Sequence, residues 1–308
     1  MLINDHFQNY KRYGIPKAQL VIADIPYNVG KNAYGSNPAW YIGGDNANGE
    51  SKLANTEFFD TDKDFRPPEF MHFCSKMMKK ENPKKRNSSP CMIVFCEFMQ
   101  QFALIKLAKE YNINGYINLV FRKNFSAQVL KANMRVVGNA EYAILLYRDR
   151  LPKFNNKGKM IFNIIDWERD TKDDLYEKIH PTQKPVKLLE KLISIFTDPG
   201  DVVIDPVAGS GATIVAAENI GRKGIGFEIK KDFYKKALAW TELNSKVKSE
   251  IKESGYSKTL MLKQNPNQMV FAMHKNNAKE KSSSGSQTVQ LRRNHGQNIL
   301  RWIIQQKQ

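Results

Sequence analysis

The chain has 308 residues, with 48 Lys and Arg against 31 Asp and Glu and a formal net charge of +17. Its 41% hydrophobic and 26% charged residues are ordinary for a globular protein, which excludes wholesale disorder. No apolar run reaches the roughly 18 residues of a membrane span, and the first residues lack the pattern of a signal peptide. Three cysteines without a Cys-x-x-Cys pair exclude a disulfide framework and a structural zinc site. We therefore expect a soluble, cytoplasmic protein that binds a polyanion, with no membrane and no metal.

Short apolar runs and helical spacing predict strands that alternate with helices along most of the chain. The predicted strands are residues 19–23, 92–96, 116–121, 142–147, 201–205 and 224–228, and the predicted helices are residues 98–111, 185–196 and 212–219.

The most informative stretch runs from Asp201 to Glu228 and predicts a strand, a small-residue turn, a helix and a second strand. Gly209 and Gly211 let the main chain of the turn approach a ligand closely, and Glu228 could accept hydrogen bonds from ribose hydroxyls. The turn is neither a dinucleotide fingerprint nor a Walker loop. Asp205 would repel phosphates and attract an ammonium or a sulfonium. The segment indicates an adenosine ligand without phosphate, with a ligand-free turn as the alternative.

Three motifs in one order carry a family resemblance. They are Asp24-Ile25-Pro26-Tyr27, His180-Pro181-Thr182-Gln183-Lys184-Pro185 and Asp205-Pro206-Val207-Ala208-Gly209-Ser210-Gly211. Together they resemble the S-adenosylmethionine-dependent amino methyltransferases of DNA, beta group, from about Leu2 to Leu243. The resemblance implies an α/β, Rossmann-like methyltransferase fold, with a largely parallel sheet, helices on both faces and a circularly permuted motif order.

The resemblance implies that the first motif is catalytic. Asp24 and the carbonyl of Ile25 would accept hydrogen bonds from the exocyclic N6 of adenine, Pro26 would hold the turn, and Tyr27 would stack on the base. The base must be flipped out of the duplex at a cost of a few kcal/mol, and stacking of about 1–3 kcal/mol offsets much of that cost. The family usually has proline where Ile25 stands, so the added N–H of Ile25 needs a partner.

The resemblance further implies S-adenosylmethionine as cofactor, S-adenosylhomocysteine as product and no metal. Thr182 and Lys184 would lie over the cofactor, and Asp5 would close its adenine site. The implied cofactor residues are Asp5, Thr182, Lys184, Asp205, Pro206, Ala208, Gly209, Ser210, Gly211 and Glu228.

Two further segments, Phe121-Arg122-Lys123-Asn124 and Asn139-Ala140-Glu141-Tyr142, resemble family segments near the flipped base and the DNA. The candidate DNA-binding residues are Arg122, Lys123, Asn124 and Arg135. For the three charged ones, the alternative is that they are surface charges without a DNA role.

Charge and composition suggest a division of the chain into a catalytic domain, residues 1–245, and a basic extension, residues 246–308. The extension carries twelve Lys and Arg against three Glu, a net charge of +9. It is typical of a partly flexible arm with a short helix near residues 299–304, which either contacts nucleic acid or is merely solvated. Residues 28–66 and 148–179 are candidate insertions for target recognition.

The sequence leaves the target open. Asp at position 24 favours adenine N6, with cytosine N4 on the same fold as the nearest alternative. More distant alternatives are a methyltransferase that acts on RNA or on a protein, and a DNA-binding protein without activity. Pro90-Cys91 lacks the context of a cytosine-C5 nucleophile, so we expect Cys91 to be a buried thiol. Double-stranded DNA is the implied partner, and a homodimer and a cognate restriction endonuclease stay open.

Overall fold

The computed structural model describes residues 1–27, 65–123, 128–129, 137–167, 170, 179–180, 183–254, 256–265, 268–275, 287–293 and 300–305. The chain divides into two compact units, residues 1–168 with 180–238 and residues 169–179 with 239–308, and each is described by itself.

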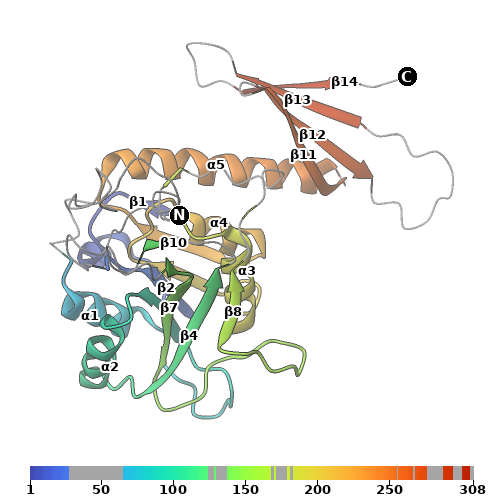
Figure 1. Ribbon diagram of the computed structural model, residues 1–308. Coiled ribbons are helices and arrows are strands. Elements are labelled where there is room, and N and C mark those ends of the chain that lie inside the picture. Colours follow the sequence, from blue (N-terminus) through green and yellow to red (C-terminus); the bar gives the residue numbers. More distant parts are fainter. Residues whose placement is uncertain are drawn as a thin grey trace. The chain divides into compact units, whose positions relative to one another are not determined.

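The first unit is built on a sheet whose strands follow the order β1-β10-β9-β2-β3-β7-β4-β8 within the described residues (Figure 1). β7 runs antiparallel to both β3 and β4, and the other pairings are parallel. The strands are β1 (Leu2–Ile3), β2 (Leu20–Asp24), β3 (Cys91–Cys96), β4 (Gly115–Lys123), β7 (Ala140–Tyr147), β8 (Ile164–Trp167), β9 (Val202–Asp205) and β10 (Lys223–Phe227). The largely parallel sheet predicted from the sequence is confirmed.

Helices cover both faces of this sheet, with α1 and α2 on one side and α3 and α4 on the other (Figure 1). The helices are η1 (Phe7–Tyr13, a 3-10 helix), α1 (Pro67–Met77), α2 (Gln100–Glu110), α3 (Val186–Phe196), α4 (Ala212–Asn219) and α5 (Lys231–Ser254). β5 (Gln128–Val129) and β6 (Val137–Gly138) pair as a separate antiparallel ribbon. None of the helices in the described ranges combines the length and hydropathy that a bilayer crossing requires.

Successive side chains of a strand point to opposite faces of the sheet, and here both sets are apolar, so both faces must be covered by helices. Val21 and Ala23 of β2 belong to the same core as Phe73 of α1 and Leu104 of α2, whereas Ile22, between them, is equally buried on the opposite face. Strands buried on both faces read as continuous apolar runs, which is why the sequence revealed them. Cys91 of β3 is fully buried, as predicted, and burial raises the pKa of its thiol.

Glycines in β10 allow α4 to lie close to the sheet. A Cβ on Gly224 would come within 2.8 Å of the Cα of Ile214 in α4, and a Cβ on Gly226 would come within 2.8 Å of the Cβ of Ala208. Such distances are far below van der Waals contact. The turn before α4 therefore keeps its place because β10 presents backbone here rather than side chains.

Gly224→Ala is expected to destabilise the fold by about 1–3 kcal/mol, the usual cost of overpacking a core. The obstructing atom belongs to the backbone of α4, so a rotamer change cannot relieve the clash. Urea unfolding followed by circular dichroism measures the effect. An unchanged midpoint would mean that α4 can move away from β10 without loss.

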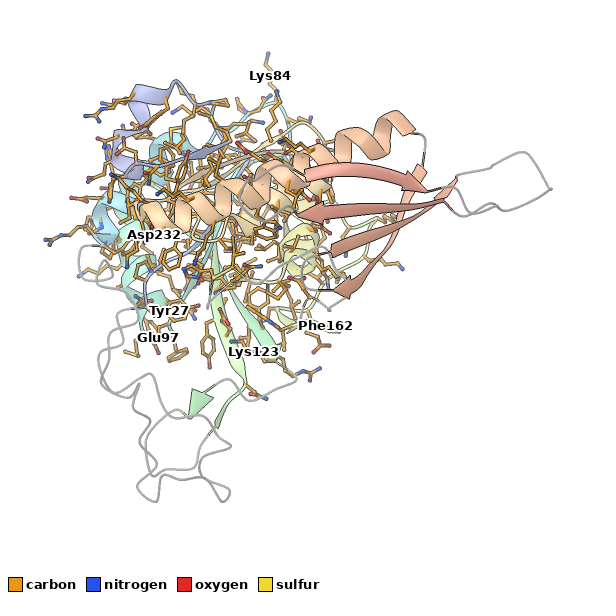
Figure 2. The ribbon with its side chains drawn as sticks, turned by 90° about the horizontal axis from the view of Figure 1, so that it is seen from above. Tyr27, Lys84, Glu97, Lys123, Phe162 and Asp232 are labelled. Atoms are coloured by element: carbon orange, nitrogen blue, oxygen red, sulfur yellow. The ribbon has the colours of Figure 1, made fainter. Side chains whose placement is uncertain are left out.

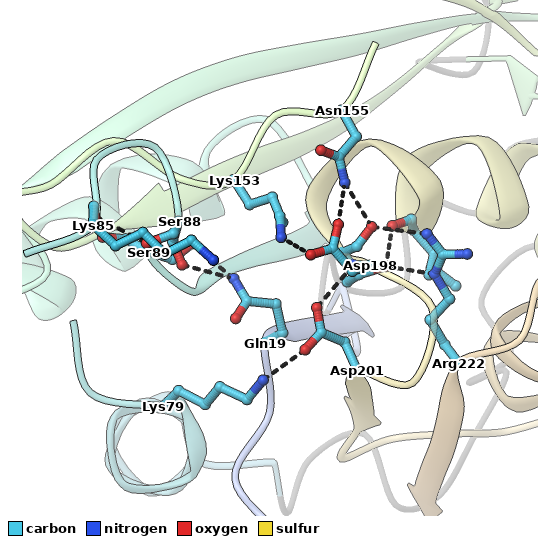
Figure 3. Close-up of polar contacts among 12 residues, drawn as sticks. Gln19, Lys79, Lys85, Ser88, Ser89, Lys153, Asn155, Asp198, Asp201 and Arg222 are labelled. Atoms are coloured by element: carbon cyan, nitrogen blue, oxygen red, sulfur yellow. Dashed lines mark hydrogen bonds and ion pairs between the residues drawn. The ribbon is translucent and has the colours of Figure 1, made fainter. Parts of the chain in front are cut away.

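Polar contacts hold the amino-terminal edge of the sheet (Figure 3). The ammonium of Lys79 pairs with Asp201 at 2.6 Å, and Lys153 pairs with Asp198. The side-chain amide of Gln19 donates to the carbonyl of Ser89 at 3.0 Å. These contacts connect the segments that precede β2, β3 and β9 with one another and with the segment that follows β7.

The second unit holds an antiparallel sheet of order β11-β12-β13-β14 within the described residues. Its strands are β11 (Tyr256–Asn265), β12 (Gln268–Lys275), β13 (Gln287–Arg293) and β14 (Leu300–Gln305). The short helix predicted near residues 299–304 is wrong, because β14 occupies that place and pairs with β13. The predicted boundary at residue 245 falls inside α5, which continues unbroken to Ser254.

Candidate active site

The two motif turns leave neighbouring parallel strands at the same edge of the sheet. β2 ends at Asp24 and β9 ends at Asp205. The chain continues from β9 to β10 on one side, whereas β3 lies beside β2 on the other, so the strand order diverges between β9 and β2. Ligands of open α/β sheets bind at the carboxyl ends of strands at such a point. In Figure 2, Tyr27 and Lys123 lie on one side of the unit, and Lys84 lies on the far side.

The glycine turn is held open by backbone geometry and by one carboxylate. Gly209 and Gly211 have φ angles of +51° and +79°, a region that favours glycine. The two carboxylate oxygens of Glu228 accept hydrogen bonds from the N–H groups of Gly209, at 2.9 Å, and Lys230, at 2.7 Å. Burial raises the pKa of Glu228, and these N–H groups offset part of that rise. The same turn carries the other predicted cofactor residues, Pro206, Ala208 and Ser210.

Asp205 lies beneath the turn, with a side chain only 4% exposed. Its Oδ1 accepts a hydrogen bond from the N–H of Val207 at 3.0 Å, and its Oδ2 accepts one from the hydroxyl of Thr213 at 2.7 Å. Burial raises the pKa of Asp205 to about 7 in spite of these donors. Asp205 therefore braces the turn against the start of α4 and supplies negative charge that a bound cation would stabilise.

Asp5 belongs to the same edge because β1 pairs with β10. The side-chain amide of Asn4 donates to the carbonyl of Glu228 at 2.7 Å, which ties the end of β1 to the end of β10. The carboxylate of Asp5 accepts hydrogen bonds from the hydroxyl of Tyr13, at 2.6 Å, and the amide of Asn9, at 2.7 Å. These two donors lower the pKa of Asp5. Asp5 is thus ionised beside the acid that closes β10.

The Asp24–Tyr27 turn is anchored from two sides. The N–H of Ile25, which the sequence left without a partner, donates to the carbonyl of Phe95 in β3 at 3.2 Å. The side-chain amide of Gln100, at the start of α2, donates to the carbonyl of Pro26 at 2.9 Å. The loss of the usual proline at position 25 is therefore compensated by a hydrogen bond.

A chain of charged groups surrounds Asp24. The ammonium of Lys184 contacts Oδ2 of Asp24 at 2.5 Å and Oε1 of Glu141 at 2.7 Å. The ammonium of Lys123 contacts Oε2 of Glu141 at 2.5 Å, and the hydroxyl of Tyr27 donates to Oε1 of Glu141 at 2.9 Å. The other oxygen of Asp24, Oδ1, is buried and has no described donor in hydrogen-bond geometry, although the hydroxyl of Tyr27 lies near enough to lower the pKa of Asp24.

Burial and charge act in opposite directions on these groups. Burial raises the pKa of Asp24, and Lys184 cancels only part of that rise. For Glu141 the two ammonium groups outweigh burial and bring its pKa down to about 2. Burial and the carboxylates of Asp24 and Glu141 raise the pKa of Tyr27, so its hydroxyl stays protonated and acts as a donor. The two ammonium groups therefore favour the ionised form of Glu141, whereas ionisation of Asp24 depends on the positive charge of Lys184.

The remaining predicted residues differ in their burial and in their partners. Lys123 is only 14% exposed and is engaged at Glu141, whereas Arg122 is exposed and pairs with Asp166 at 2.7 Å. A phosphate contact of either residue, and a cofactor contact of Lys184, stay predictions. Three predicted residues lie outside the described part of the chain: Thr182, Asn124 and Arg135.

Trp167 was not predicted from the sequence. It ends β8, which pairs in parallel with β4, and the ammonium of Lys123 lies 4.9 Å from the centroid of its ring. Residues 164–167, which fall within the candidate insertion 148–179, form an edge strand of the main sheet. The apolar pair Ile164–Ile165 was the available signal. A target-recognition role of residues 148–179 stays a prediction. Most of the other candidate insertion, residues 28–66, lies outside the described part of the chain.

Comparison with known proteins decides the family. The family model described as "DNA methylase", that of the N6/N4 methylases, matches residues 18–239. The chain belongs to the N6/N4 DNA methylase family. These methylases modify DNA at an exocyclic amine of adenine or cytosine, so the family resemblance of the three motifs is confirmed.

Individual relatives of this DNA methylase agree with the assignment. It is 27% identical to the DNA adenine methyltransferase YhdJ of Escherichia coli (strain K12) over 80% of this chain and 83% of the relative. It is 38% identical to the type II methyltransferase M2.DpnII of Streptococcus pneumoniae, over 29% of this chain and 33% of that protein.

Two solved structures share the fold of this DNA methylase. The M1.HpyAVI–SAM complex has a TM-score of 0.52 and 22% identity, covering 78% of this chain and 98% of that one. The cytosine-N4-specific PvuII DNA methyltransferase has a TM-score of 0.54 and 16% identity, covering 82% and 94%. The predicted methyltransferase fold is therefore confirmed.

Proposed function

We propose that the chain is an S-adenosylmethionine-dependent methyltransferase that modifies the exocyclic N6 of an adenine flipped out of duplex DNA. The observation that carries the proposal is the buried Oδ1 of Asp24, to which no residue in the described part of the chain donates a hydrogen bond. A buried carboxylate oxygen without a hydrogen-bond donor is costly unless a ligand satisfies it. An amine is a donor, and Tyr27 lies beside this oxygen, in the same turn, with a ring on which a base can stack.

The residues at the carboxyl edge fit S-adenosylmethionine. Asp5, Asp205 and Glu228 place three carboxyl groups near a turn that carries no side chain at Gly209 and Gly211. Such a site repels phosphates and suits a ligand with a cationic sulfonium and an ammonium. Glu228 would accept hydrogen bonds from the ribose, and the turn would hold the methionine part. When bound, the cofactor would supply an activated methyl group: the N–C bond would form as the C–S bond breaks, S-adenosylhomocysteine would leave, and the surplus proton of the amine would pass to Oδ1 of Asp24 and on to solvent.

The chain's own residues prepare the amine. The lone pair of an adenine N6 is delocalised into the ring, which makes it a poor nucleophile. Hydrogen bonds from the two amine protons to Oδ1 of Asp24 and to the carbonyl of Ile25 favour a pyramidal nitrogen with its lone pair exposed. Tyr27, fixed through its hydroxyl at Glu141, would hold the base in position. The acceleration would come mainly from orientation and from fixed charge.

Two arguments favour adenine over cytosine. The first residue of the catalytic turn is Asp rather than Ser, and the relative that aligns with 80% of this chain is a DNA adenine methyltransferase. The PvuII enzyme is cytosine-specific, but at 16% identity it bears on the fold alone. For DNA binding we propose a contribution of Arg122 and of the basic residues 246–308, which predicts weaker binding at higher salt. A homodimer and a cognate restriction endonuclease stay predictions.

Incubation of the full chain with S-adenosylmethionine and unmodified plasmid DNA is expected to produce N6-methyladenine. Mass spectrometry of the digested nucleosides measures the product. N4-methylcytosine without N6-methyladenine would contradict the choice of adenine. Duplex RNA of the same sequence is the control, and preferential methylation of the RNA would overturn the assignment to DNA.

A further inference from the structure

One lysine connects the two carboxylates of the candidate site. Lys184 precedes α3, whereas Asp24 ends β2 and Glu141 lies in β7. Its ammonium is shared between one oxygen of each carboxylate, at 2.5 Å and 2.7 Å, and its side chain is only 8% exposed. Aromatic rings complete the enclosure, since the ammonium lies 5.2 Å from the ring centroid of Phe95 and 5.9 Å from that of Trp167.

We propose that Lys184, backed by Glu141 and Lys123, is a positioning residue that fixes Asp24 in its ionised, substrate-accepting state. Because Lys184 occupies Oδ2 of Asp24, the carboxylate presents Oδ1 to the amine. Glu141 holds Lys184 in place, and Lys123 supplies the second positive charge that lets two carboxylates lie so close together. This inference rests on the proposed function, since it specifies how the acceptor for the amine is maintained.

The balance of charge explains why the arrangement needs Lys184. Five described ionisable groups lie around Asp24: Lys184 before α3, Glu141 in β7, Tyr27 after β2, Cys96 in β3 and Asp205 in β9. Lys184 supplies the opposite charge among these five, and Lys123 lies behind Glu141. Without Lys184, burial and the charge of Glu141 would both favour protonation of Asp24. A protonated Asp24 would be a poorer acceptor for the amine.

The pH dependence of kcat tests this proposal in two opposite directions. Lys184→Met removes the charge but keeps an unbranched side chain, so the acidic limb of the kcat profile is expected to move to higher pH. We expect kcat at pH 7 to fall about 100-fold, as for a misplaced reacting group. Glu141→Gln removes the charge that opposes ionisation of Asp24, so its acidic limb is expected to move to lower pH. Loss of a packing contact alone would move neither limb.

Three controls make the result decisive. Lys184→Arg keeps the positive charge and is expected to return the acidic limb toward its wild-type position. Lys79→Met removes a lysine that also pairs with an aspartate, Asp201, but at the opposite edge of the sheet (Figure 3). It is expected to leave the pH profile of kcat unchanged. Thermal unfolding and the Kd for S-adenosylmethionine are measured for every variant. If Lys184→Met does not fold, the Glu141→Gln profile still decides, because only the proposed role moves its acidic limb to lower pH.

The outcomes separate this proposal from the proposed function. If the wild-type chain does not methylate DNA, the proposed function fails. If the wild-type chain methylates DNA but the limbs of Lys184→Met and Glu141→Gln do not move, the positioning role is overturned. A weaker affinity of Lys184→Met for S-adenosylmethionine with an unmoved limb would also overturn it, in favour of a cofactor contact.

Discussion

Replacement of Asp24 by alanine is expected to abolish methyl transfer while leaving binding of duplex DNA nearly unchanged. The substitution removes Oδ1, which would accept the amine, and among the described residues it leaves Glu141 as the carboxylate that pairs with the ammonium of Lys184. Loss of a group that acts on the developing charge costs about 10²–10³-fold in kcat, and loss of orientation adds to it. Methyl incorporation from labelled S-adenosylmethionine measures the rate, and fluorescence anisotropy with a labelled duplex measures the binding.

Asp24→Asn is expected to lose as much methyl-transfer activity as Asp24→Ala, although asparagine has nearly the same shape as aspartate. The amide oxygen would turn toward the ammonium of Lys184, so the NH₂ group would face the amine of the substrate, donor against donor. Asp166→Ala is the matched control, because it removes an exposed carboxylate that pairs with Arg122 and leaves Asp24 untouched. Activity above a tenth of the wild-type rate in Asp24→Ala would refute the assignment of Asp24 as the acceptor.

The edge of the sheet that carries the candidate site could be predicted because each of its acids stands at the end of a strand that is readable in the sequence. Asp24, Asp205 and Glu228 each follow a buried apolar run, so each lies at a strand end, and parallel strands bring such ends to one edge. The glycines of the turn were also readable, since positive φ angles favour glycine.

The network around Asp24 could not be predicted because it depends on packing between distant segments. Lys184 reaches Asp24 across 160 positions of the chain. Lys123 was predicted as a DNA contact or a surface charge, and its pairing with Glu141 follows only from the placement of β4 beside β7. A lysine next to a proline carries no signal of burial. The helix predicted at residues 299–304 was wrong for a different reason, because a short apolar run fits a helix as well as a strand. Pairing with β13 makes this run a strand.

Replacement of Glu228 is expected to weaken cofactor binding more than it slows the methyl-transfer step. Glu228 closes β10 and fixes the glycine turn through the N–H of Gly209, so its loss removes both an acceptor for the ligand and a support of the turn. A hydrogen bond to a charged group contributes about 1.5–3 kcal/mol. We therefore expect Glu228→Ala to weaken binding of S-adenosylmethionine by about 10- to 100-fold by isothermal titration calorimetry.

Glu228→Gln makes this prediction more specific. Both oxygens of Glu228 accept from backbone N–H groups, those of Gly209 and Lys230. A glutamine retains one acceptor and must set its NH₂ group against the other N–H, which leaves two donors opposed. The amide should therefore be nearly as harmful as alanine, although it could still accept a hydrogen bond from one hydroxyl. Wild-type affinity in Glu228→Gln would show that the carboxylate only fills space, and the cofactor would then have to be held by the turn itself.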